Sequence, residues 1–88
     1  MELHIATRSL PDETGRLRTF HYYLTVGIVE TGSFCFENYG VRICEEQAHS
    51  VCIPSLTTSA VRIDQLMTTL VDNAVAPSGL RDVVEEWL

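Results

Sequence analysis

The cysteines and histidines are the side chains in this sequence best suited to metal binding or nucleophilic chemistry. Cys35, Cys44, Cys52 and His49 are all of ligand types that zinc accepts. Their spacings match no zinc knuckle or finger, and no two cysteines form a C-x-x-C pair. Because cysteine is also among the most buried residue types, we interpret the three cysteines as structural residues and predict no metal site.

Nucleophilic catalysis also needs a base and a group that orients the base. The candidate bases are His4, His21 and His49, and each lies in an alternating pattern typical of a β-strand. No G-x-x-x-x-G stretch is followed by Lys and Ser or Thr, so the sequence contains no phosphate-binding loop. We therefore predict a protein that is not an enzyme, has no catalytic residue and uses no cofactor.

Length and charge narrow the function classes further. A chain of 88 residues forms one domain and buries only about 60 to 65% of its unfolded surface, which leaves little volume for a deep cavity. Twelve acidic residues outnumber six arginines, and the formal charge is −6. From Glu45 onward, seven acids face only Arg62 and Arg81. This balance argues against direct binding to nucleic acid or to an anionic membrane.

The cellular compartment follows from two further features. Three cysteines are an odd number, which argues against a disulfide framework. The first residues carry no basic leader followed by a long apolar run, and no segment approaches the roughly 20 apolar residues of a membrane span. We expect a cytoplasmic protein without membrane contact.

The longest alternating stretch, residues 17–30, predicts the central strand of the fold. Its even positions from Phe20 to Ile28 are apolar, so one face of the strand faces the core. We expect the strand to bend or fray at Gly27, because fourteen extended residues exceed the width of so small a domain. A first strand over 2–9 places Leu3 and Ile5 inward and Ala6 outward, and a turn at 11–15 makes the pair a hairpin.

Two more strands follow. Over 33–44 the apolar parity changes between Phe36 and Tyr39, which predicts a β-bulge there. His49 to Ile53 alternates as a fourth strand, and Pro54 ends it.

The apolar period then changes from two to about 3.6, which predicts helices. Thr57, Thr58 and Ser59 offer N-cap oxygens to a helix that runs to about Asn73. Ser78 can cap a second helix. The apolar stripe of that second helix, which we expect to be buried, consists of Leu80, Val83, Val84, Trp87 and Leu88.

These elements predict an α+β fold, a four-stranded antiparallel β-meander with two C-terminal helices packed on one face. Residues 1–88 form a single domain, with the β-meander in 1–56 and the helical pair in 57–88.

Two segments, Tyr39-Gly40-Val41-Arg42-Ile43 and VAPSGLRDVVEEWL at 75–88, carry a resemblance to a known family. They are similar to a family of short proteins from clostridia-like Firmicutes, a domain of unknown function with a Tyr-Gly-Ile-x-Ile strand and a Val-x-Pro-x-x-Leu-x-Asp-Val-Ile-Glu-Asp ending. The similarity covers about the last fifty residues. Gly79 and the Glu86-Trp87 pair depart from the family pattern. The resemblance implies no activity.

The sheet face that two short helices leave bare is the first candidate site. Such a face mixes aromatic, arginine and hydrogen-bonding side chains, which is typical of binding hot spots. The residues that we expect in the interface are His21, Tyr23, Thr25, Val29 and Arg42. We predict a small non-catalytic protein-interaction or regulatory module that binds a protein partner or itself, as a homodimer.

The acidic helical side supports an alternative. A small acidic protein can occupy the nucleic-acid-binding groove of a partner enzyme, as phage-type inhibitors do. The carboxylates that would form this acidic partner surface are Asp64, Asp72, Asp82, Glu85 and Glu86.

Overall fold

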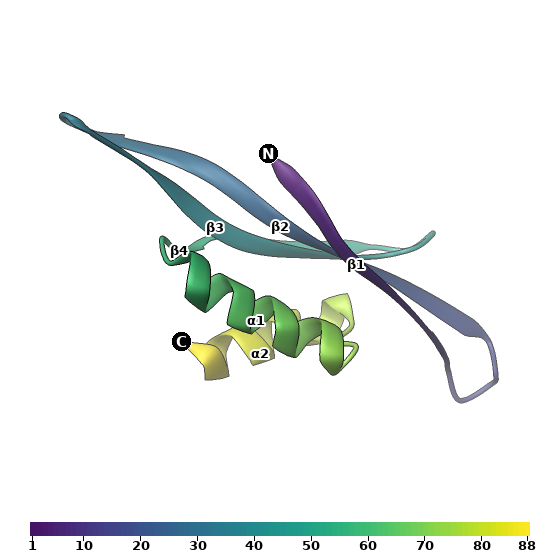
Figure 1. Cartoon of the computed structure of the whole chain (residues 1–88). Helices are drawn as coiled ribbons and strands as arrows, with labels where there is room; N and C mark the ends of the chain where they lie inside the picture. The colour runs from purple at the N-terminus through teal and green to yellow at the C-terminus, as the bar shows by residue number, and fades with distance from the viewer.

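The computed structural model describes all residues from Met1 to Leu88 and confirms the α+β fold. Four antiparallel strands form one sheet in the order β1-β2-β3-β4, and both helices lie on the same face of it (Figure 1). The elements are β1 (Glu2–Pro11), β2 (Leu17–Thr31), β3 (Phe34–Glu45), β4 (Ser50–Thr57), α1 (Ala60–Asp72), the 3-10 turn η1 (Pro77–Gly79) and α2 (Leu80–Trp87).

The sheet is much longer than the helical layer that covers it. The molecule measures 55 × 24 × 16 Å, and hairpins extend past the helices at both ends (Figure 1). β2 continues through Gly27 and stays paired with β3 as far as Thr31 and Phe34. Of the expected bend or fray at Gly27, the fray is therefore wrong, because β3 extends together with β2 and satisfies its backbone beyond the body. We call residues 27–38, at the distal end of this hairpin, the arm.

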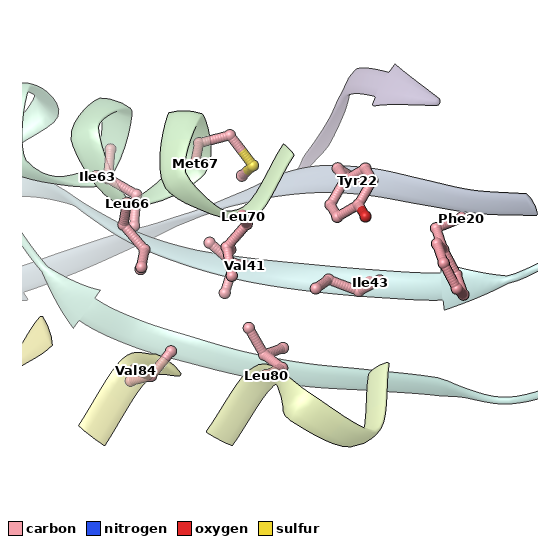
Figure 2. Packing of buried hydrophobic residues seen from close by; sticks show 10 residues of the cluster. All are labelled: Phe20, Tyr22, Val41, Ile43, Ile63, Leu66, Met67, Leu70, Leu80 and Val84. Carbon is pink, nitrogen blue, oxygen red and sulfur yellow. The ribbon is translucent and has the colours of Figure 1, made fainter. Parts of the chain in front are cut away.

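The hydrophobic core lies between the middle of the sheet and the two helices (Figure 2). Its ten buried residues are Phe20, Tyr22, Val41, Ile43, Ile63, Leu66, Met67, Leu70, Leu80 and Val84. The Tyr22 hydroxyl donates to the Val75 carbonyl at 3.0 Å, which ties β2 to the segment after α1. Burial raises the pKa of Tyr22. The predicted inward face of β2 is thus correct through Leu24, which packs against the core, whereas Ile28 lies beyond the helices.

A bulge in β1 changes the facing of its residues. The register shifts between His4, which pairs with Tyr23, and Ala6, which pairs with Tyr22. Ile5 is the extra residue, and Ala6 consequently packs against the core on the side of the helices. The prediction that Ala6 points outward is wrong, because the alternation of the sequence does not reveal the added residue.

The bulge predicted in β3 between Phe36 and Tyr39 is also wrong. Every residue of β3 from Phe34 to Glu45 pairs with β2 without a register shift. Unbroken pairing places the side chains of Phe34 and Phe36 on the face away from the helices, opposite to Tyr39.

The irregularity lies in β4 instead. Tyr39 pairs with Thr57 and Val41 with Ile53, so three β4 residues stand opposite Gly40. Ser55 in this bulge has a φ of 62°. β4 thus passes through Pro54 instead of ending there. A Cβ on Gly40 would lie 2.5 Å from the Pro54 Cα and 2.7 Å from the Thr25 Oγ1, so only glycine fits beneath the bulge.

The predicted N-cap is correct for α1 and wrong for α2. Ser59 is the N-cap of α1, and its Oγ accepts from the Arg62 N–H at 3.2 Å. Ser78 caps nothing, because it lies inside η1, and α2 begins after Gly79 without a side-chain cap. Trp87 is half-buried beneath the Arg62 guanidinium, whose Cζ lies 4.4 Å from the ring centroid. The expectation of a fully buried stripe is therefore wrong at the partly buried Val83 and Trp87 and at the exposed Leu88.

Candidate interaction surface

The five predicted interface residues all lie on the sheet face that carries no helix, which we call the open face. His21 pairs across the strands with Cys44, and Tyr23 pairs with Arg42. The Arg42 guanidinium lies over the Tyr23 ring, with 4.2 Å from Cζ to the centroid. It also donates two hydrogen bonds, each 2.9 Å long, to the Glu2 carboxylate, which raises the pKa of Arg42. The structure thus holds the Arg42 side chain in a fixed orientation.

The histidines of the open face form a second connected group. The Thr7 Oγ1 lies 2.9 Å from the His4 Nε2 and 3.0 Å from the His21 Nδ1. The His4 ring also packs edge-on against Tyr23 at a centroid distance of 5.3 Å. A hydroxyl between two imidazoles is a polar bridge, but none of the four surface hollows touches it. The hydrogen bonds through Thr7 thus join His4 on β1 to His21 on β2.

Two of the three cysteines lie near each other on the open face. Cys44 stands opposite His21 and Ser50, whereas Cys52 stands opposite Arg42, so the two thiols are diagonal neighbours on the open face. Cys35 lies in the arm, and all three thiols are free.

The arm carries two functional candidates that the sequence reasoning missed. Phe34 is 74% exposed and Phe36 is 41% exposed. Both project from the open face, where Phe36 pairs with Val29. The sequence does contain a signal for them, the change of apolar parity after Phe36, although that change also fits the β-bulge predicted above. It marks aromatic side chains that turn away from the core.

Neither edge of the arm is covered by another strand. The pairing of β1 ends at Glu2 and Thr25, and that of β4 ends at Tyr39 and Thr57. The arm is therefore a two-stranded ribbon that projects from the body (Figure 1). Its charged side chains, Glu30 and Glu37, lie on the opposite face from the two phenylalanines. The phenylalanine face of the arm is thus uncharged.

The five predicted acidic residues do not form one surface. Asp64 and Asp72 line a hollow between α1 and β1, together with Ala6. Asp82, Glu85 and Glu86 lie on α2. Arg62 lies between the two helices and stacks on Trp87 of α2. The carboxylates therefore separate into two groups on different sides of α1.

The far end of the sheet contains the other ion pair. Arg18 donates to both Glu45 oxygens, at 3.1 Å from Nε and 2.7 Å from the terminal nitrogen. These hydrogen bonds lower the pKa of Glu45 and raise that of Arg18. In the neighbouring turn the Asp12 carboxylate accepts from the Thr14 hydroxyl at 2.7 Å, which lowers the pKa of Asp12. This end is polar and internally paired.

Comparison with known proteins gives one match. The sequence model of a family of unknown function (DUF6514) matches residues 1–88, the whole chain and not only its last fifty residues. No curated protein and no solved structure matches the chain. No helix has the length and apolar character needed to cross a membrane.

Proposed function

We propose a function for this chain, which belongs to the DUF6514 family of unknown function. The proposal is based on the surfaces of the chain itself. The protein is a small non-catalytic protein-interaction module with a regulatory role, and it contacts its partner through the open face and the arm. The observation that carries this proposal is the uncovered arm with its exposed phenylalanines.

Exposure of the arm's two phenylalanines to water is unfavourable in free energy. An isolated two-stranded hairpin is marginally stable, and its exposed aromatic side chains gain free energy when another surface covers them. An aromatic side chain buries roughly 200 Å² when fully covered. At the observed exposures, covering Phe34 and Phe36 removes roughly 230 Å² from water, worth about 6 kcal/mol at about 25 cal/mol per Å².

That gain does not suffice for a stable complex by itself. Association costs about 4 to 15 kcal/mol in lost freedom of motion. The partner must therefore cover more than the arm. The adjoining part of the open face, with Tyr23 and Arg42 already ordered by their mutual contact, is the surface that continues from it. Ordered aromatic and arginine side chains lose little entropy on binding, which supports their role as anchors.

A second copy of the chain is one partner that fits this surface. Both helices lie on the side of the sheet opposite to the open face (Figure 1). Two copies that met through their open faces would therefore keep their acidic helices on the outer sides of the dimer. Two-fold dimers are also the commonest oligomers. Sedimentation of the wild type and of Tyr23→Glu distinguishes self-association from a foreign partner. A dimer that dissociates on substitution identifies self-association through the open face. A monomer in both cases excludes the dimer and leaves a foreign partner as the surviving option.

Site-specific photo-cross-linking tests the interaction itself. The photoreactive residue p-benzoylphenylalanine is placed at position 36, in cells that naturally produce the protein. A matched control places it at Glu13, in the exposed turn at the other end of the sheet. We expect a discrete cross-linked protein, either a second copy or a foreign chain, from position 36 only. Equal cross-linking from both positions, or none from position 36, would contradict the proposal.

A cytoplasmic location completes the proposal. Its support is the state of Cys35, Cys44 and Cys52, which are all free, two of them exposed. Exposed free thiols persist in a reducing compartment.

A further inference from the structure

A groove on the helical face is separate from the open face and from the arm's phenylalanines. Two hollows, of about 270 and 160 Å³, lie between α1 and the strands and share Ile5, Asp64 and Met67. The two hollows are therefore adjacent along α1, and we call them together the α1–β1 groove. It runs from Tyr39 and Ala60 at one end to Val71 and Asp72 at the other.

The groove is apolar and its surroundings are exposed. Six of the seven residues that line the larger hollow are hydrophobic. On the β1 side of the groove, Leu3 is 44% and Ile5 47% exposed. α1 covers the sheet over β2 and β3 but leaves these β1 side chains in water, since Leu3 and Ile5 belong to the bulged half of β1. A contiguous apolar region of this kind marks an interaction site.

The rim of the groove is negatively charged. Asp64 and Asp72 stand on the α1 wall and are both exposed. They are eight residues apart, which corresponds to about 12 Å along the helix. The one cation at the groove's end, Arg8, is already engaged, because its guanidinium donates to the Val71 carbonyl at 2.7 Å. A partner with positive charges thus finds two free carboxylates at a fixed spacing.

The backbone of the occupant must satisfy its own hydrogen bonds. The floor of the groove consists of side chains from Ile5, Leu24 and Met67. The free edge of β1 points sideways in the plane of the sheet, so it does not lie under a chain that rests on this floor. An extended peptide would leave its amides unpaired there, whereas an α-helix bonds its own backbone internally. α1 itself is 13 residues long, about 20 Å, and a second helix can pack beside it at the usual 8 to 10 Å.

We propose that the α1–β1 groove binds a basic amphipathic α-helix of a partner protein. Apolar side chains at positions i, i+3, i+4 and i+7 of that helix fill the hollows, and basic side chains two turns apart pair with Asp64 and Asp72. A second copy of this chain does not fit as the occupant, because its formal charge of −6 repels the acidic rim.

Fluorescence anisotropy with synthetic helices tests this binding. The probe is an 18-residue, fluorescein-labelled Leu/Lys peptide with leucine at helical spacing. The controls are a Leu/Glu peptide of the same pattern and a Leu/Lys peptide with a central proline, which cannot form a continuous helix. We expect saturable binding of the first peptide alone. Equal binding of the proline peptide would overturn the proposal, because it would show attraction by charge without the helix.

Matched variants of the protein locate the site. Asp64→Asn/Asp72→Asn and Glu85→Gln/Glu86→Gln remove the same charge from the groove rim and from α2, respectively. We expect the rim variant to lose about fivefold or more in affinity and the α2 variant to stay within about twofold. Equal losses would mean a general electrostatic effect and contradict the site.

A third variant and a spectroscopic readout cover the apolar part of the groove. Ile5→Glu places a charge in the groove at an exposed position, and we expect it to abolish binding while the melting temperature stays near that of the wild type. In NMR titrations of the wild type, signals of Ile5 and Met67 shift with added peptide, whereas Tyr23 on the open face does not. Shifts confined to the open face would place the helix elsewhere and refute the groove.

Discussion

Replacing Gly40 with alanine tests the architecture of the β3–β4 pair most severely. The added Cβ would lie 2.5 Å from the Pro54 Cα and 2.7 Å from the Thr25 Oγ1, and still closer to the Ile53 carbonyl oxygen. Two of these three contacts are backbone, which cannot rotate away, so the β4 bulge must move. Overpacking of this kind costs about 1 to 3 kcal/mol, and we expect the upper end for Gly40→Ala.

The assay is urea denaturation together with a thermal melt. For a domain of this size each kcal/mol shifts the melting temperature by about 4 to 8 °C, so Gly40→Ala melts at least about 10 °C below the wild type. Gly27→Ala is the matched control, because its Cβ meets nothing nearer than the Asn38 carbonyl oxygen at 4.0 Å. We expect that control within about 0.5 kcal/mol of the wild type. If both variants lose the same free energy of unfolding, the close passage of β4 over Gly40 is refuted.

Three further predictions concern the helices and the pH dependence of stability. Trp87→Ala lowers the free energy of unfolding by about 1 to 3 kcal/mol in urea denaturation, less than the 3 to 5 of a fully buried aromatic, because the indole is half-buried. Ser59→Ala costs about 1 kcal/mol through its lost cap, whereas Ser78→Ala, which caps nothing, leaves the urea midpoint unchanged. The pKa of Glu45 is lowered in the folded state by Arg18, so its contribution is present at neutral pH. That contribution is lost as the pH falls below the ordinary glutamate range. We therefore expect Arg18→Gln to flatten the acid limb of a profile of unfolding free energy against pH. An unchanged acid limb would contradict a stabilising role of the Arg18–Glu45 pair.

The fold was predictable because its main patterns do not depend on distant contacts. The alternation from Phe20 to Leu24 and the helical period around Leu66 each specify a buried face. Ser59 caps α1 through a bond to the nearby Arg62 amide, so the local sequence is enough to find it.

The errors within the sheet involve contacts that one strand alone cannot reveal. The extra residue at Ile5 depends on how β1 meets β2, and the bulge opposite Gly40 depends on how β4 meets β3. Sequence parity shows a change of face near Phe36, but both a bulge and an exposed aromatic pair produce that change. Only the register with β2 distinguishes them.

The candidate site was predictable in its location but not in its internal bonds. The face of Tyr23 and Arg42 followed from alternation alone. The contact of Arg42 with Glu2 joins residues forty positions apart, and the sequence contains no signal for it. The α1–β1 groove likewise depends on where α1 lies across the sheet.

Hydrogen exchange of the arm tests the central claim, that the arm is a binding surface, most directly. In the isolated protein at low micromolar concentration, residues 27–38 form a two-stranded ribbon with no third strand on either side. Their amides therefore exchange faster than those of the four-stranded centre of the sheet. In the complex, either the concentrated protein or the partner identified by cross-linking at position 36, we predict that protection increases at the arm. Protection that appears elsewhere while the arm continues to exchange rapidly would contradict the account.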